Sequence, residues 1–198
     1  SFISIGNIFI QGLVNSYGSD VIAGYSAAVK LNTFLITGMT TLGNGISGFT
    51  AQNLGAGLPG RIREGYRAGI KMALGVTVPF FIGFFFFGKA MMLLFMENAG
   101  GQAMETGILF LRIVSPFYFV ISVKLIADGI LRGTESMRYF MIATFTDLIL
   151  RVILAYLFSA WLEEAGIWMS WPAGWCVGTL LSIIFYGKVM NRLAEKKR

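Results

Sequence analysis

The chain contains six long apolar segments separated by short polar stretches, and this pattern limits the folds open to it. A helix that crosses a bilayer needs about 20 predominantly apolar residues, and all but the first segment reach that length. No segment shows the apolar–polar alternation of a transmembrane β-barrel. The sequence therefore predicts an all-α integral membrane protein, a six-helix transmembrane bundle formed by one domain over residues 1–198. The expected spans are residues 2–15, 21–49, 70–96, 106–131, 139–161 and 165–190.

The composition argues against the soluble classes of protein. Hydrophobic residues make up 56% of the chain and charged residues 13%. In a soluble domain, roughly 45–50% of residues are apolar and about 25% are charged. There is no histidine, and the single cysteine, Cys176, cannot form an internal disulfide. A soluble enzyme and a histidine-based metal site are therefore excluded as first interpretations. Because the first segment is short and opens at Ser1 without a charged region, we expect a truncated helix, not a signal peptide.

The distribution of Lys and Arg predicts the orientation of the bundle. Basic residues of short loops stay on the cytoplasmic side, and here they collect at alternate ends of the segments. We therefore expect a plasma-membrane protein, prokaryotic, with a cytoplasmic C-terminus and membrane lipid as a partner. This topology explains the net charge of +6 without a nucleic-acid partner. The basic ends carry Arg61, Arg63, Arg67, Lys71, Arg132, Arg138, Lys188, Arg192, Lys196, Lys197 and Arg198, and the opposite ends carry Asp20, Glu97, Glu105, Glu163 and Glu164.

Charged residues inside the spans are candidates for function, because an isolated charge at the centre of a membrane helix costs roughly 2.5–3.5 kcal/mol. Asp147 and Arg151 are four residues apart and share a helix face about 15 Å into their span. They form either a structural ion pair or part of a cation or substrate pathway. Lys124, Asp128 and Arg132 follow the same spacing. They form either an interfacial ladder of charges with extended stems or a second part of the pathway.

Polar residues in the first two segments are further candidates. Lys30 lies about nine residues into its span and has no partner nearby in the sequence. It either pairs across helices or lines water. Asn7, Gln11 and Asn15 form one polar stripe at four-residue spacing. The stripe either makes hydrogen bonds between helices or lines a polar cavity.

Two motifs suggest enzymes, but their contexts do not support that interpretation. Gly43, Gly45 and Gly48 match a dinucleotide-binding pattern but lie inside an apolar span, where close helix packing explains them better. Asp128-Gly129 is similar to the start of the metal-binding motif of membrane phosphotransferases, but the further aspartates of that motif are missing. We therefore expect that the protein is not an enzyme. Two more glycine pairs have packing spacing, Gly129 with Gly133 and Gly174 with Gly178.

Four stretches occur in a distinctive order along the chain. They are Val14-Asn15 through Gly18 to Ile22-Ala23-Gly24, then Gly43-Asn44-Gly45 with Ala51-Gln52-Asn53-Leu54-Gly55-Ala56-Gly57 and Arg61, then Gly129-Ile130-Leu131-Arg132-Gly133, and finally Gly166-Ile167-Trp168 with Trp171-Pro172 and Gly174-Trp175. Together they resemble the multidrug and toxic compound extrusion (MATE) transporters over almost the whole chain. That resemblance implies the C-terminal lobe of a 12-helix transporter, with its first helix truncated. Its partner would be an N-terminal six-helix half.

The resemblance also implies a function. MATE transporters export amphipathic, often cationic, small molecules by alternating access, driven by entry of Na⁺ or H⁺. Some members carry acids in the seventh and tenth helices, where this chain has Asn7, Gln11, Tyr118 and Ile121. We therefore expect the coupling-ion site largely in the N-terminal half, and no cofactor. Tyr118 remains a candidate for the pathway.

Two alternatives remain open. One is a lipid-linked oligosaccharide flippase of the same superfamily, against which the Gln52–Gly57 loop argues. The other is a non-transporting membrane scaffold or half-subunit, which would show no substrate-dependent flux. A natural half-length chain would pair with a second copy of itself, because the fold is duplicated.

Overall fold

The computed structural model describes residues 2–96 and 101–195, and every regular element in these ranges is helical. Glu97, Lys196, Lys197 and Arg198 lie outside the described residues, so only the remaining charges of the predicted orientation can be placed in the structure. The elements are α1 (Phe2–Asn15), α2 (Ser19–Gly55), α3 (Pro59–Phe86), α4 (Gly88–Met92), α5 (Gln102–Val114), the 3₁₀ turn η1 (Ser115–Phe117), α6 (Tyr118–Gly133) and α7 (Met137–Glu195).

Three helical stretches are long and apolar enough to cross a membrane: Pro59–Phe86, Gln102–Gly133 and Met137–Glu195. Helix α2 is also long, at 37 residues. However, Thr, Ser, Asn and Gly residues recur along it, and it is not among those three.

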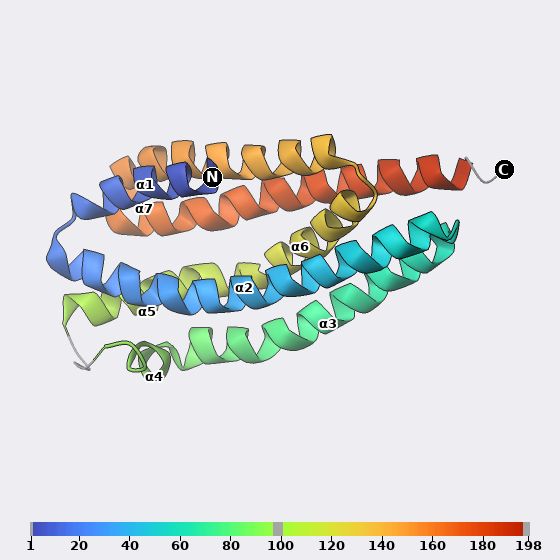
Figure 1. The fold of residues 1–198 in the computed structure, drawn as a ribbon. Coiled ribbons are helices and arrows are strands. Elements are labelled where there is room, and N and C mark those ends of the chain that lie inside the picture. Colours follow the sequence, from blue (N-terminus) through green and yellow to red (C-terminus); the bar gives the residue numbers. More distant parts are fainter. Residues whose placement is uncertain (1, 97–100, 196–198) are drawn as a thin grey trace.

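Helix α7 is bent at Glu163 into two antiparallel arms, which form a helical hairpin (Figure 1). Glu163 has φ 52° and ψ −135°. Beside the bend, the backbone of Gly166 packs against the carbonyl group of Phe158, where a β-carbon would not fit. At the other end of the hairpin, the rings of Tyr139 and Phe185 stack with centroids 4.6 Å apart. The expected spans 139–161 and 165–190 are these two arms.

The boundary between the second and third expected spans was wrong. Helix α2 continues to Gly55 and α3 begins at Pro59, so only a short turn separates them. Gly57 adopts a positive φ of 69° in that turn, and proline suits the first turn of a helix because its missing N–H has no partner there. Arg61 therefore lies on α3 and not in a loop.

The next two spans also differ from the expectation. The segment expected over 70–96 ends as a long helix at Phe86 and continues as the short α4. The segment expected over 106–131 consists of α5, η1 and α6. Pro116 lies in η1, because proline cannot donate the backbone hydrogen bond that a continuous helix requires.

The basic turns gather at one end of the bundle. Figure 1 shows the α2–α3 turn, the α6–α7 turn and the end of α7 together at this end. The α1–α2 turn and the bend of α7 lie at the opposite end. This arrangement agrees with the alternation of charge along the chain.

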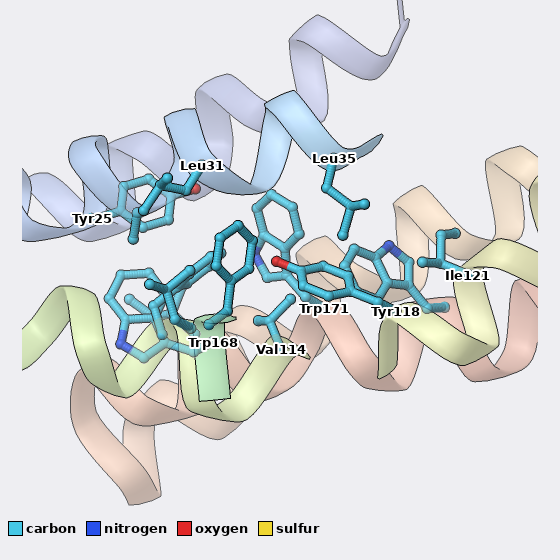
Figure 2. Packing of buried hydrophobic residues seen from close by; sticks show 14 of the residues in the cluster. Tyr25, Leu31, Leu35, Val114, Tyr118, Ile121, Trp168 and Trp171 are labelled. Atoms are coloured by element: carbon cyan, nitrogen blue, oxygen red, sulfur yellow. The ribbon is translucent and has the colours of Figure 1, made fainter. Parts of the chain in front are cut away.

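Aromatic side chains join α2, α5 and the second arm of α7 into one core (Figure 2). Tyr25 stacks on Trp168 with ring centroids 4.7 Å apart. Phe110 meets the edges of Trp168 and Trp171 at 5.5 and 5.6 Å. Such pairs each add about 0.5–1.5 kcal/mol beyond the burial of their area, so this core fixes the second arm against the rest of the bundle.

Small residues allow α2 and α6 to cross closely. The Cα of Gly129 lies against the backbone of Gly43, and that of Gly133 against Ser47. The packing interpretation is therefore right for Gly43. It is wrong for Gly45 and Gly48, because a β-carbon on either would meet no atom of the described residues within 4 Å.

Candidate substrate and cation pathway

Two buried ion pairs are formed by the charged residues at four-residue spacing. In α6, Lys124 Nζ lies 2.6 Å from Asp128 Oδ2. In the first arm of α7, Arg151 Nη2 donates a hydrogen bond of 3.1 Å to Asp147 Oδ1. All four residues are buried. Each pair forms because a helix places residues i and i+4 on one face.

The second arm of α7 brings the two pairs together. A β-carbon on Gly178 would lie 2.8 Å from Lys124 Cε and 2.9 Å from Asp147 Cβ. One on Gly174 would lie 2.6 Å from Asp147 Oδ1. Because these two positions carry no side chain, Lys124 of α6 and Asp147 of the first arm approach each other over Gly178. We call these four charged residues the charge cluster.

The two acids of the charge cluster are held differently. Asp128 has both oxygens engaged, since Oδ1 also accepts a 2.6 Å hydrogen bond from Ser182 Oγ. Asp147 accepts only from Arg151 among the described residues. Its side chain is 8% exposed, compared with 3% for Asp128. Asp147 is therefore the acid with oxygen available for a further partner.

Arg151 occupies an aromatic site. Its guanidinium carbon lies 4.7 Å from the centre of the Trp171 ring and 6.0 Å from that of Trp175. Arg151 Nε and Trp171 Nε1 are buried without a hydrogen-bond partner among the described residues. Buried donors without a partner cost about 1–3 kcal/mol each, so this region has donors available for an acceptor.

Arg132 does not extend the row of charges in α6. Its guanidinium carbon lies 5.4 Å from the centre of the Phe140 ring, and the described part of the chain contains no ion pair between it and Asp128. A ladder of three charges is therefore not formed.

Tyr118 is buried away from the surface. Its hydroxyl donates a 3.0 Å hydrogen bond to Asn32 Oδ1 in α2. Nearby, Ser122 Oγ donates to the carbonyl oxygen of Tyr118 and lies 2.7 Å from Thr77 Oγ1 of α3. These contacts tie α2, α3 and α6 together beside the aromatic core.

The polar stripe on α1 lies on the surface of the bundle. Asn7 and Asn15 are exposed and Gln11 is half-buried. Gln11 Nε2 donates a 2.9 Å hydrogen bond to Asn15 Oδ1 within the same helix. In residues 2–96 and 101–195, the stripe makes no hydrogen bond between helices, so this arrangement favours a polar lining.

Lys30 is exposed and lines an open groove of about 770 Å³ between α2 and α3. Thr33, Thr37 and Thr41 line the groove along the same helix, and Phe34 and Phe80 are on its apolar side. No ion pair to Lys30 occurs within the described ranges. Of its two interpretations, the structure favours a side chain that lines an open space.

The candidates thus lie at four separate places. The structure brings Lys124, Asp128, Asp147 and Arg151 together, whereas Lys30, Tyr118 and the α1 stripe lie elsewhere. Sequence reasoning missed Ser182 and Asn32. Ser182 continues the four-residue spacing of Gly174 and Gly178, and that repeat was a usable signal. The described residues contain no group of three or more His, Cys, Asp or Glu that could hold a metal.

A family model described as MatE matches residues 1–157. The chain belongs to the MatE family. This is a family of multi-pass membrane transporters, not of enzymes, and the sequence interpretation of the fold is confirmed. The probable multidrug resistance protein YpnP of Bacillus subtilis is 26% identical over 196 residues, which cover 96% of this chain and 44% of that protein.

Solved structures show the same fold. A crystal structure of MATE in the bent conformation aligns with a TM-score of 0.90 at 17% identity, covering 98% of this chain and 43% of that one. The outward-facing conformation of a multidrug resistance MATE family transporter of the MOP superfamily aligns with a TM-score of 0.87 at 17% identity. That alignment covers 98% of this chain and 44% of the other. This MatE chain thus spans less than half the length of the relatives that it matches.

Proposed function

We propose that this chain is the C-terminal half of a cation-coupled efflux antiporter for amphipathic or cationic small molecules. It works by alternating access together with an N-terminal six-helix half. One observation carries the proposal: nearly the whole chain aligns with 43% of a MATE structure at a TM-score of 0.90. A single lobe of a two-lobed transporter has this relation to the complete protein.

The uncovered polar face supports a pathway between two halves. The α1 stripe and the groove at Lys30 put polar side chains on the surface of an otherwise apolar bundle. Polar groups in contact with lipid are costly. A second half that covers this face, with water and substrate between the halves, removes that cost.

In this proposal the charge cluster links the pathway to the packing of the helices. Asp147 holds Arg151 in place over the tryptophans, and the cluster joins α6 to both arms of α7. A cationic substrate or a proton at Asp147 weakens its pairing with Arg151 and changes how the arms pack. The coupling-ion site itself lies largely in the N-terminal half, with Na⁺ or H⁺ as co-substrate.

Lys30 favours a second candidate. A cation in an open apolar groove attracts an anionic group, such as the pyrophosphate of a lipid-linked oligosaccharide. The flippase is therefore the alternative to drug export. A membrane scaffold is the third outcome.

Transport by the full-length protein in liposomes tests these functions. We expect ethidium, an amphipathic cation, to be exported from the liposomes against its gradient when an inward Na⁺ or H⁺ gradient is imposed. Translocation of a pyrophosphate-linked lipid without ethidium flux would instead identify the flippase. A folded protein that moves neither compound would be a scaffold and would overturn the proposal.

A further inference from the structure

The basic end of the bundle is hollowed between the two arms of α7. The hollow has a volume of about 940 Å³. It is bounded by the α6–α7 turn, the start of the first arm and the end of the second arm. No step of the proposed transport uses it, so its occupant is a separate question.

Three cations from two elements line this hollow. Arg138 comes from the first arm, whereas Lys188 and Arg192 lie one helical turn apart on the second arm. Glu135 is the only acid among the lining residues. Within residues 2–96 and 101–195, none of the three cations forms an ion pair. The excess positive charge makes the hollow complementary to an anion.

Hydroxyl groups and an aromatic wall complete the polar part. Thr134 and Ser136 line the hollow beside the cations, as does Tyr139. The ring of Tyr139 stacks on Phe185, and Lys188 Nζ lies 5.9 Å from the centre of the Phe185 ring. The Thr134 and Ser136 hydroxyls already donate to the carbonyl oxygens of Ile130 and Thr134, so the cations are the donors that a phosphate oxygen would use.

The rest of the lining is apolar and leads onto the outer surface of α7. Leu54, Ile142 and Val189 contribute to this part of the lining. From there, Ile142, Ile149 and Ile153 are 49%, 57% and 51% exposed. Their spacing of seven and four residues places them on one helix face. An amphiphile would contact both the cationic lining and the stripe of Ile142, Ile149 and Ile153, whereas a small free anion would contact only the cations.

We propose that this hollow binds the phosphate headgroup of an anionic glycerophospholipid from the cytoplasmic leaflet. Arg138, Lys188 and Arg192 hold the phosphate. One acyl chain lies along the stripe formed by Ile142, Ile149 and Ile153. A bound lipid of this kind fastens the two arms of α7 to each other at their open end.

Lipid binding to the purified full-length protein, followed by native mass spectrometry, tests the proposal. Phosphatidylglycerol should bind more tightly than phosphatidylcholine. Each basic residue near an anionic membrane surface contributes about fivefold in affinity. The double variant Lys188→Gln/Arg192→Gln should therefore bind phosphatidylglycerol about 25-fold more weakly. The loss for phosphatidylcholine should be smaller, because its choline cation offsets the charge of its phosphate. The matched control is Arg61→Gln/Arg63→Gln, which removes the same charge from α3, outside the hollow, and should leave the preference intact.

A variant with higher affinity provides a test that loss of folding cannot mimic. Glu135→Gln removes the acid from the lining and should raise the affinity for phosphatidylglycerol about fivefold. Equal affinity for the two lipids would overturn the proposal, as would an equal loss in the control variant. If millimolar inorganic phosphate displaces phosphatidylglycerol, the hollow is a site for free anions and the lipid assignment is wrong. All these readouts measure binding, so they stand apart from the transport assay.

Discussion

Asp147 and Asp128 are both buried acids with a basic partner one helical turn away, yet they are not equivalent. Asp128 has both carboxylate oxygens engaged, by Lys124 and Ser182, and it joins α6 to the second arm of α7. Asp147 has a single partner and is the more accessible of the two. At the residue scale, we therefore propose that Asp128 braces the bundle and that Asp147 takes part in the pathway.

The first prediction concerns Asp147→Asn in the full-length protein. The neutral amide leaves Arg151 buried without its counter-charge, so we expect a loss of about 3–5 kcal/mol in stability and impaired transport. Adding Arg151→Met should restore the melting temperature, because a neutral pair avoids the unpaired charge. Transport should stay impaired in that double variant. Normal ethidium flux in either variant, with normal expression, would show that Asp147 is structural.

At the scale of elements, the second arm of α7 holds the charge cluster together through positions without side chains. Gly178→Ala places a methyl group 2.8 Å from Lys124 Cε and 2.9 Å from Asp147 Cβ. Overpacking of this kind costs about 1–3 kcal/mol, so the variant should melt at a lower temperature. Gly187→Ala on the same arm is the control. It meets no described atom within 4 Å and should be neutral or up to about 1 kcal/mol more stable.

The bend of α7 gives a prediction of the opposite sign. Glu163 adopts φ 52° and ψ −135°, a region that costs a residue with a β-carbon about 1–3 kcal/mol. Glu163→Gly removes that cost and should raise the free energy of unfolding by about 1 kcal/mol, measured by thermal denaturation. Glu164→Gly should lower it, because Glu164 accepts a hydrogen bond from Thr106 and its backbone is helical. Lower stability in Glu163→Gly would show that the side chain, not the backbone, holds the bend.

The elements that sequence reasoning located correctly depend on local patterns. The pair Asp147–Arg151 was foreseeable because a helix repeats every 3.6 residues. The contact of Asp147 and Lys124 across Gly178 could not be predicted, because it depends on how α6 lies against the two arms of α7. The α2–α3 boundary was misplaced for a related reason. Polar residues such as Gln52 and Arg61 are typical of a loop. Here, however, α2 extends through Gln52 and α3 includes Arg61, beyond the apolar stretches.

At the scale of the whole molecule, the chain has a buried aromatic core and charge cluster and, on the outside, a polar face on α1 and α2. The core explains how one lobe packs as a unit. In the proposed transporter, the polar face is the surface that a second lobe covers in one state and leaves open in another. Alternating access therefore predicts that residues on this face change their exposure to water.

Cysteine labelling measures that change. In a Cys176→Ser background of the full-length protein, Asn7→Cys and Lys30→Cys should react with a water-soluble maleimide. Their rates should differ severalfold with and without ethidium or an ion gradient, because substrate and ion shift the population between two states. Ile149→Cys, on the apolar stripe of α7, should stay unreactive throughout, since lipid covers it. Equal rates at Asn7→Cys and Lys30→Cys under all conditions would mean that this face does not line a pathway, and the alternating-access proposal would fail.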